Sequence, residues 1–171
     1  GDLDVIAIAC EAGIACVQVF FIRDGLNLGN KSFFPKNTKK EQTEDILNAF
    51  LSQYYLNSLQ INRHIPATIL INQAIPDQDI LDGIFKQKCA HKVSISSNTR
   101  GERNKWVELA VNNAKNTLNS RLSQGAKIRQ QFEKLQESLQ LVNLPKRIEC
   151  FDISHSSGEA TVASCVVFNH D

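Results

Sequence analysis

Two apolar runs at the start of the chain limit the folds that it can adopt. Residues 4–10 form a nearly continuous apolar run, residues 14–22 form a second one, and Gly13 lies between them. Runs of this kind are typical of strands that are buried on both faces. The Asp24-Gly25 pair then predicts a tight hairpin that leads into a weaker strand over residues 26–34. The chain is therefore predicted to begin with three antiparallel strands.

The pattern changes after this region, because helices begin to alternate with strands. Thr43, followed by Glu44 and Asp45, is predicted to start a helix, since acidic residues favour the positive N-terminal end of a helix. The next predicted elements are a strand over 67–72, a helix over 77–87, a strand over 93–96 and a helix over 106–122. The residues predicted to face the core from the first two helices are Ile46, Leu47, Phe50, Leu51, Tyr54, Ile80, Leu81, Ile84 and Phe85. The order β-β-β-α-β-α-β-α is that of the ribonuclease H fold, although other α+β folds share it.

The last part of the chain is predicted to continue beyond this mixed α/β sheet and its flanking helices. Residues 126–142 carry apolar residues at helical spacing, and Asn143 and Pro145 are predicted to stop that helix. Two further strands are predicted over 148–153 and 161–168, around a turn at Gly158. The expected division is a ribonuclease H-like domain over 1–125, a linker helix over 126–146, and a β-hairpin within residues 147–171.

Charge is distributed unevenly along a chain whose formal net charge is only +1. Residues 100–147 hold ten Lys and Arg against four Asp and Glu, whereas residues 148–171 hold four acidic residues and no Lys or Arg. A basic middle before an acidic end suits a phosphate-facing surface beside a metal-binding pocket. The candidate DNA contacts in the basic segment are Arg100, Arg103 and Lys105. The alternative, in which these side chains only coat a solvated helix, stays open.

The five cysteines indicate the compartment in which the protein works. Their number is odd and none of them forms a C-x-x-C pair, which favours reduced thiols over disulfides or a zinc site. No apolar stretch is long enough to span a membrane, so a cytoplasmic protein is expected. The sequence has no Met, including at position 1, and is expected to be an internal fragment.

Asp152 lies in the middle of a predicted strand, in the segment 149–155, which reads ECFDISH. A buried carboxylate needs a partner, because burying a bare charge is very costly. A Mg²⁺ or Mn²⁺ ion is one such partner, and many nucleases hold such an ion on a strand-borne carboxylate. An aspartate that bonds to its own turn is the alternative. His155 can assist the chemistry, contact phosphate, or only pack locally near the end of the strand.

The segment IECFDISH, followed by Gly158 and TVASCVVF, closely resembles the entry to the endonuclease domain of the bacterial UvrC excinucleases. The resemblance covers almost the whole chain. Its other segments are Asp4–Ala9, Val17–Gly25, Phe33–Pro35, Phe50–Tyr55, Arg100–Gly101 and Glu108–Ala114. Two departures are Ser157, where the family usually has glutamine, and Asn98, where proline is common. The first departure puts a role for the residue before Gly158 in doubt.

The resemblance implies that the parent protein is a metal-dependent DNA endonuclease of nucleotide excision repair. In that family the complete protein cuts the damaged strand on both sides of a lesion bound by UvrA and UvrB. The ribonuclease H-like domain makes the 5′ cut with two aspartates and a histidine. By this resemblance residues 147–171 are the first β-hairpin of this second, truncated ribonuclease H-like domain. Asp152 is then the first of those aspartates and a ligand of Mg²⁺ or Mn²⁺, and the other two residues follow Asp171. The chain alone is therefore expected not to cut DNA.

Asp4 raises the question of whether the first domain is itself a nuclease. Such an activity needs companion carboxylates, yet the fourth strand ends at Asn72-Gln73, and the last helix offers Asn112 and Asn113. Neutral amides can ligate a cation but cannot neutralise its charge. The first domain is therefore predicted to be an inactive copy of the fold, with Asp4 interpreted as a turn residue at a strand end.

Three functions are compatible with the sequence. In the preferred interpretation, the chain belongs to a metal-dependent endonuclease. In the second, which describes the isolated chain best, it is a non-catalytic module that binds UvrB or DNA. In the third, it belongs to another ribonuclease H-like enzyme, such as a recombinase.

Overall fold

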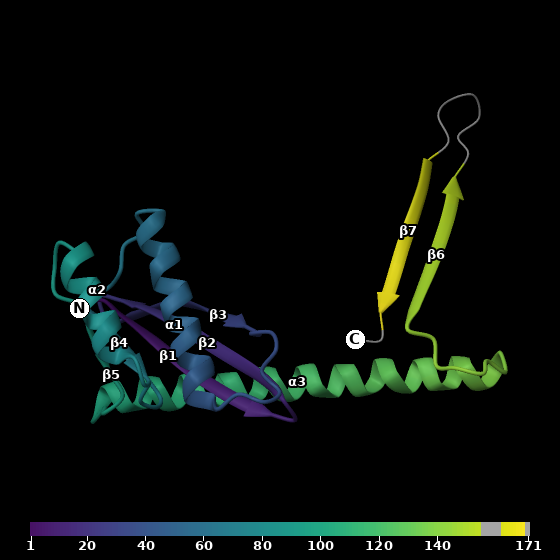
Figure 1. The fold of residues 1–171 in the computed structure, drawn as a ribbon, viewed down its shortest axis with the longest axis horizontal. Coiled ribbons are helices and arrows are strands. Elements are labelled where there is room, and N and C mark those ends of the chain that lie inside the picture. Colours follow the sequence, from purple (N-terminus) through teal and green to yellow (C-terminus); the bar gives the residue numbers. More distant parts are fainter. Residues whose placement is uncertain (155–161, 170–171) are drawn as a thin grey trace. The chain divides into compact units, whose positions relative to one another are not determined.

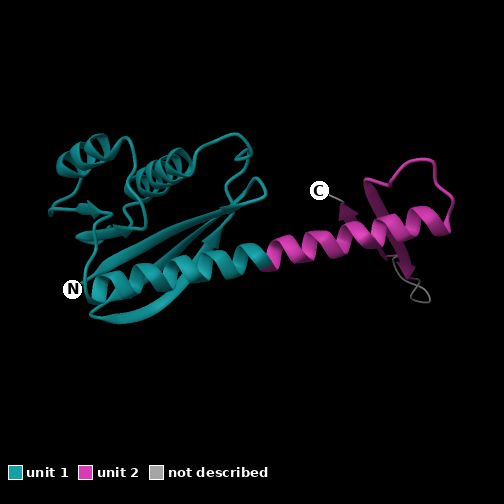
Figure 2. Cartoon of the chain, turned by 90° about the horizontal axis from the view of Figure 1, so that it is seen from below, with its two compact units in different colours: residues 1–119 teal, residues 120–171 magenta. Residues whose placement is uncertain are grey.

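The computed structural model describes residues 1–154 and 162–169. Its strands are β1 (Leu3–Glu11), β2 (Ile14–Arg23), β3 (Leu26–Phe33), β4 (Thr68–Ile71), β5 (Ser94–Ser96), β6 (Arg147–Ser154) and β7 (Val162–Asn169). Its helices are α1 (Thr43–Gln60), α2 (Gln78–Lys88) and α3 (Glu102–Ser138) (Figure 1). The chain divides into two compact units, residues 1–119 and residues 120–171, and α3 contributes to both (Figure 2).

The first unit is built on a five-stranded mixed sheet with the order β3-β2-β1-β4-β5. β1 pairs antiparallel with β2, from Leu3 opposite Ile22 to Glu11 opposite Ile14, and it pairs parallel with β4. β4 in turn pairs parallel with β5. Three antiparallel strands followed by parallel strands that helices connect confirm the predicted ribonuclease H-like α/β fold.

Two hairpin turns set the register of the three antiparallel strands. Ala12 and Gly13, between β1 and β2, have φ values of 50° and 75°. Asp24 and Gly25, between β2 and β3, have φ values of 50° and 78°. Two consecutive residues with positive φ are the mark of a type I′ turn, whose twist matches that of the strands that it joins. The hairpin predicted from Asp24-Gly25 is therefore confirmed.

Alternating side chains of the sheet pack into two separate cores. One face packs against α1 and α2 through Ile6, Ile8, Val19, Ile69, Leu47, Leu51, Tyr55 and Phe85. The opposite face packs against α3 through Val5, Ala7, Phe20, Ile22, Leu70, Val107 and Ala110. Both faces of β1 and β2 are thus buried, as the two apolar runs predict.

Two helical side chains differ from their predicted positions. Tyr55, and not Tyr54, lies deepest on the buried face of α1, with 1% of its surface exposed, while Tyr54 packs only at the edge of that core. Ile80, predicted to face the core, is 61% exposed. Leu81 and Phe85 lie one turn apart and form the buried stripe of α2. Ile80 precedes that stripe by one residue, which turns it away by about 100° around the helix axis.

α3 is one continuous helix, whereas the sequence predicts separate helices over 106–122 and 126–142. The predicted break is wrong because Gly125 keeps a negative φ and a glycine inside a helix costs only about 1 kcal/mol. The helix also ends at Ser138, before the predicted stop. There Gln140 adopts a φ of 52° and the Leu141 N–H donates to the Gln136 carbonyl at 2.9 Å, which is the pattern of a Schellman cap. The predicted linker helix is thus the end of α3, and the domain boundaries stay a prediction.

The second unit contains a two-stranded antiparallel sheet, in which β6 runs from Arg147 opposite Asn169 to Ser154 opposite Val162. Large apolar side chains on both of its faces are exposed, for example Phe151 at 65% and Phe168 at 55%. Among the described residues, no helix has a stretch long and apolar enough to cross a membrane.

Candidate metal-binding carboxylates

Asp152 is the sixth residue of β6, and its cross-strand neighbour on β7 is Ser164. Because side chains alternate along a strand, Asp152 shares a face with Ile148, Cys150 and Ser154. The sequence predicts a buried strand, but Asp152 is exposed, as is nearly all of β6. The reason is that β6 pairs only with β7 and has no further strand beside it in the described part of the chain. In this structure the carboxylate therefore keeps its contact with water.

Asp152 is the one carboxylate on its face of β6. Glu149 lies on the opposite face, where it forms an ion pair with Arg147. Within residues 1–154 and 162–169, no group of three or more His, Cys, Asp and Glu side chains could hold a metal ion. Mg²⁺ and Mn²⁺ prefer several oxygen ligands, so a lone carboxylate offers a weak site. The described residues thus supply one candidate ligand and no complete metal site, while the predicted neighbour His155 lies outside them.

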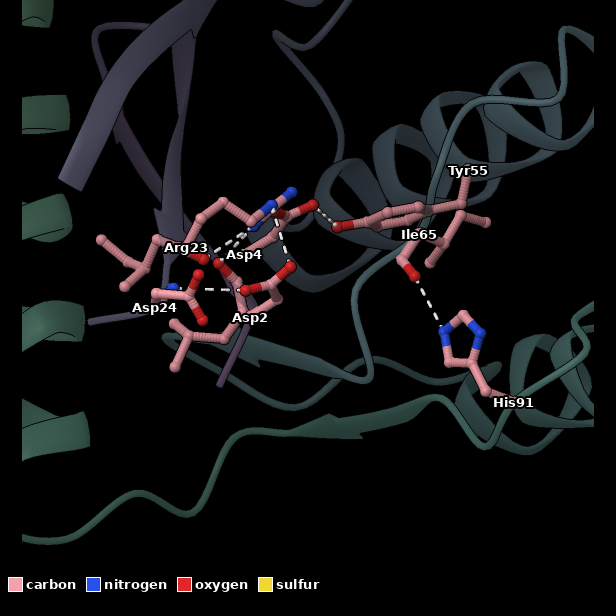
Figure 3. Close-up of polar contacts among 9 residues, drawn as sticks. Asp2, Asp4, Arg23, Asp24, Tyr55, Ile65 and His91 are labelled. Carbon is pink, nitrogen blue, oxygen red and sulfur yellow. Dashed lines mark hydrogen bonds and ion pairs between the residues drawn. The ribbon is translucent and has the colours of Figure 1, made fainter. Parts of the chain in front are cut away.

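Asp4 occupies the second position of β1 and is buried, with 3% of its surface exposed (Figure 3). The Tyr55 hydroxyl donates a hydrogen bond to Asp4 Oδ2 at 2.9 Å. Arg23 Nη2 lies 3.0 Å from Asp4 Oδ1, in an ion pair that lacks the alignment of a hydrogen bond. The interpretation of Asp4 as a turn residue is wrong, because the residue lies inside a strand and contacts side chains from β2 and α1.

Arg23 anchors this contact through the backbone as well. Its Nη1 donates to the carbonyls of Leu3 at 3.0 Å and Ile22 at 2.8 Å, and its Nε lies 3.8 Å from Asp2 Oδ2. Burial raises the pKa of Asp4 above its ordinary value, although Tyr55 and Arg23 both act to lower it. Burial and the adjacent Asp4 raise the pKa of Tyr55 well above its ordinary value, so the hydroxyl keeps the proton that it donates.

The other acidic candidates of the first unit do not join Asp4. Glu44 and Asp45 are exposed in the first turn of α1, and Asp45 precedes Tyr55 by ten residues, or roughly 15 Å of helix. Glu44 and Asp45 therefore lie far from the buried carboxylate and do not pair with it.

Asn72 occupies the position after β4 where the sequence offers an amide in place of a carboxylate. Its Oδ1 accepts the Ile8 N–H at 3.0 Å, and its Nδ2 donates to the Ile8 carbonyl at 3.1 Å. These two bonds extend the pairing of β4 with β1 by a side chain, since the backbone pairing ends at Ile71 opposite Ile6. The amide therefore serves the sheet, a role that the sequence alone did not indicate.

Arg103 and Lys105 lie in the first turn of α3, Arg100 lies two residues before the helix, and all three are exposed. Lys105 Nζ lies 3.8 Å from Glu102 Oε1, but these two side chains are 78% and 88% exposed. Exposed pairs of this kind are weak and leave the cation accessible to other partners. The contact of these three residues with DNA stays a prediction.

Comparison with known proteins gives matches along the whole chain. The family model described as UvrC Ribonuclease H-like domain matches residues 2–121, and the one described as UvrC RNAse H endonuclease domain matches residues 136–171. The chain is 46% identical over 171 residues to UvrABC system protein C of Alkalilimnicola ehrlichii, and 48% identical over 168 residues to that of Xylella fastidiosa (strain M23). These alignments cover 100% and 98% of the chain but only 27% and 26% of the relatives. The chain thus spans about a quarter of their length.

Proposed function

The chain belongs to the UvrC family, and we propose that it is the part of the DNA-repair excinuclease that leads into the domain for the 5′ incision. One observation carries the proposal: Asp152 lies in the middle of β6, inside the stretch that matches the endonuclease domain. The match of residues 2–121 to a UvrC domain sets aside the interpretation as a recombinase.

Asp152 is proposed to be a ligand of a divalent cation, Mg²⁺ or Mn²⁺. A bound divalent cation supplies an activated water and relief of charge on the phosphate that is attacked. The exposed position of Asp152 on β6 leaves its oxygens accessible to an ion. Since one carboxylate is not a complete site, the proposal requires further ligands from the longer protein, such as the family resemblance implies.

The proposed partners are damaged DNA and UvrB, which UvrA loads, in the cytoplasm. The name UvrABC system protein C, which the relatives carry, supports a place in this system. The alternative function, a non-catalytic module that binds UvrB or DNA, applies to the isolated chain. The single candidate ligand among its described residues favours that alternative for the chain by itself.

Asp152→Asn in the complete protein tests the assignment. Asparagine keeps the size of the side chain but loses its charge. We therefore expect the rate of the 5′ incision to fall by more than the roughly 10–100-fold that the loss of a residue supporting a metal ligand costs. The 3′ incision should persist, because it is proposed to use a separate site. The measurement is gel analysis of an end-labelled, damaged duplex with UvrA, UvrB and Mg²⁺.

Glu149→Gln is the matched control, because it removes one negative charge from the opposite face of the same strand. This variant should keep both incisions. The isolated 171-residue chain should leave the duplex uncut. Equal loss of both incisions in a folded Asp152→Asn protein would contradict the assignment, as would full activity.

A further inference from the structure

A groove in the first unit lies where the ends of α1 and α2 meet the segment that leads into β5. It consists of two adjoining pockets that share Cys89, Ala90 and His91. One pocket is bordered by the turn after α1, and the other by the last turns of α2. The groove is distant in sequence from Asp152, and its last lining residue, Ser94, precedes the candidate DNA contact Arg100 by six residues.

The groove concentrates positive charge. Its Lys and Arg residues are Arg63, Lys86, Lys88 and Lys92. Asp82 is its one acidic residue among those that the structure describes. This composition differs from that of residues 1–119 as a whole, which hold 13 Lys and Arg against 12 Asp and Glu. The basic character therefore belongs to the groove and not to the unit.

The negative charges near the groove do not neutralise its four cations. The C-terminal ends of α1 and α2 each carry about half a negative charge, and Asp82 carries one, so together they offset about two of the four. All four cations are exposed, and none forms an ion pair with any residue that the structure describes. Arg63 lies 5.8 Å from the centre of the Phe21 ring, and its charge also acts on the carboxyl group of Asp4. An excess of roughly one to two charges thus faces solvent.

Two exposed histidines, His64 and His91, also line the groove. The rings of His64 and His91 are stacked, with centroids 5.6 Å apart and an interplanar angle of 28°. His91 Nε2 lies 2.9 Å from the Ile65 carbonyl, so this nitrogen donates and the ring is fixed in place (Figure 3). The pair adds polar surface beside the four cations.

The groove has no exposed large apolar residue among those that the structure describes. This distinguishes between an acidic protein and a nucleic acid as its partner. Protein interfaces are centred on buried apolar and aromatic residues. In this groove Ile65 and Val93 are buried, and its half-buried Leu59 packs against the core of the unit. Binding to nucleic acid backbone needs only cations and polar donors aimed at phosphates.

We propose that this groove binds the phosphate backbone of nucleic acid. The identification of this nucleic acid as DNA rests on the proposed function. The charge and shape of the groove are observed independently of that function. The test measures binding by the 171-residue chain, and it is therefore separate from the incision assay of the complete protein.

The test compares the triple variant Lys86→Gln, Lys88→Gln, Lys92→Gln with a matched triple, Lys36→Gln, Lys39→Gln, Lys40→Gln. Both sets replace three lysines on the surface of the first unit, so both change the net charge equally. Fluorescence anisotropy of a labelled DNA duplex is followed across a salt series. We expect the groove variant to flatten the slope of log K against log salt by about 0.9 for each phosphate that is no longer neutralised, and the matched triple to leave it unchanged.

Arg63→Gln, on the other wall, should flatten the slope independently by about the amount for one phosphate. Equal effects of the two triples would overturn the proposal, because they would assign binding to net charge. An unchanged slope in a groove variant with wild-type thermal unfolding would also overturn it. Binding of polyglutamate in place of DNA would do the same and would indicate an acidic protein as partner.

Discussion

Asp4 places a carboxylate in the core of the first unit, between the Tyr55 hydroxyl and the Arg23 guanidinium. A buried ion pair gains little net stability, because desolvation of both charges opposes their attraction. Removing one partner is more costly than removing both, since the other charge is then left without compensation. A single substitution of Asp4 or Arg23 should therefore lower the stability of the protein. The contact also links β1, β2 and α1.

The pH dependence of stability gives a direct test of this contact. Burial raises the pKa of Asp4 above its ordinary value of 3.8, so the folded state binds this proton more tightly than the unfolded state. The resulting stabilisation is fully present below pH 3.8 and is lost as the pH rises through the folded-state pKa. Asp4→Asn removes the titration and keeps an oxygen for Tyr55. Measured by urea unfolding, the stability of wild type relative to Asp4→Asn should increase from about pH 7 to about pH 4.

The opposite trend would show that the Arg23 ion pair outweighs burial. In that case the folded-state pKa lies below 3.8, and wild type loses stability relative to Asp4→Asn on acidification. All other titrating groups are common to both proteins, so their effects cancel in the difference. Substituting Asp2, a more exposed acid near Arg23, by asparagine serves as the control and should give a smaller change.

The sequence alone cannot predict the role of a residue when that role depends on contact with a distant part of the chain. The amide of Asn72, where a nuclease needs a carboxylate, is evident from the sequence, but its two bonds to Ile8 join residues 64 apart. Likewise, Tyr55 reaches Asp4 across 51 residues. Both contacts exist only because β4 lies parallel to β1 and α1 packs across the sheet, and no local pattern carries that information.

At the scale of elements, local chemistry predicted the strands and hairpins well and the helix ends less well. Asp24-Gly25 favours one turn type, and the apolar runs leave little choice of element. The break predicted near Gly125 failed for a physical reason: a glycine weakens a helix without preventing it, since it still has an N–H to donate. The end of α3 depends on Gln140, whose left-handed conformation sequence propensity does not favour.

Gly125→Ala should stabilise α3 by about 0.5–1 kcal/mol. Alanine loses less conformational entropy than glycine when it becomes helical, and a Cβ at this position meets no atom within 4 Å. The measurement is hydrogen exchange of the α3 amides around Gly125, with far-UV circular dichroism for helix content. The expected result is slower exchange and no loss of helix.

Gly101→Ala is the control for that substitution. A Cβ at Gly101 also meets open space, but the residue has a φ of 60°, which disfavours any residue with a side chain. The same chemical change should therefore destabilise the protein at this position. A lack of stabilisation by Gly125→Ala would mean that Gly125 does not lie within a regular helix. Stabilisation at both positions would mean that the control Gly101 does not hold a positive φ.

On the scale of the whole molecule, the two units differ in how they bury apolar surface. The first has helices on both faces of its sheet, and its central strand β1 has hydrogen-bonded neighbours on both sides. The second has a two-stranded sheet whose apolar residues are largely exposed. A two-stranded hairpin alone is marginally stable in water, so most of the folding stability of the chain comes from the first unit.

Native-state hydrogen exchange should therefore separate the two units. Amides of β1 and β4 should exchange only through extensive unfolding, whereas those of β6 and β7 should open locally and exchange on the order of a hundredfold faster or more. β3, an edge strand that pairs only with β2, is the internal reference and should lie between them. Equal protection of β6 and β1 would contradict the prediction. If that protection disappeared on dilution, a second copy of the chain would be the element that covers the apolar faces of the hairpin.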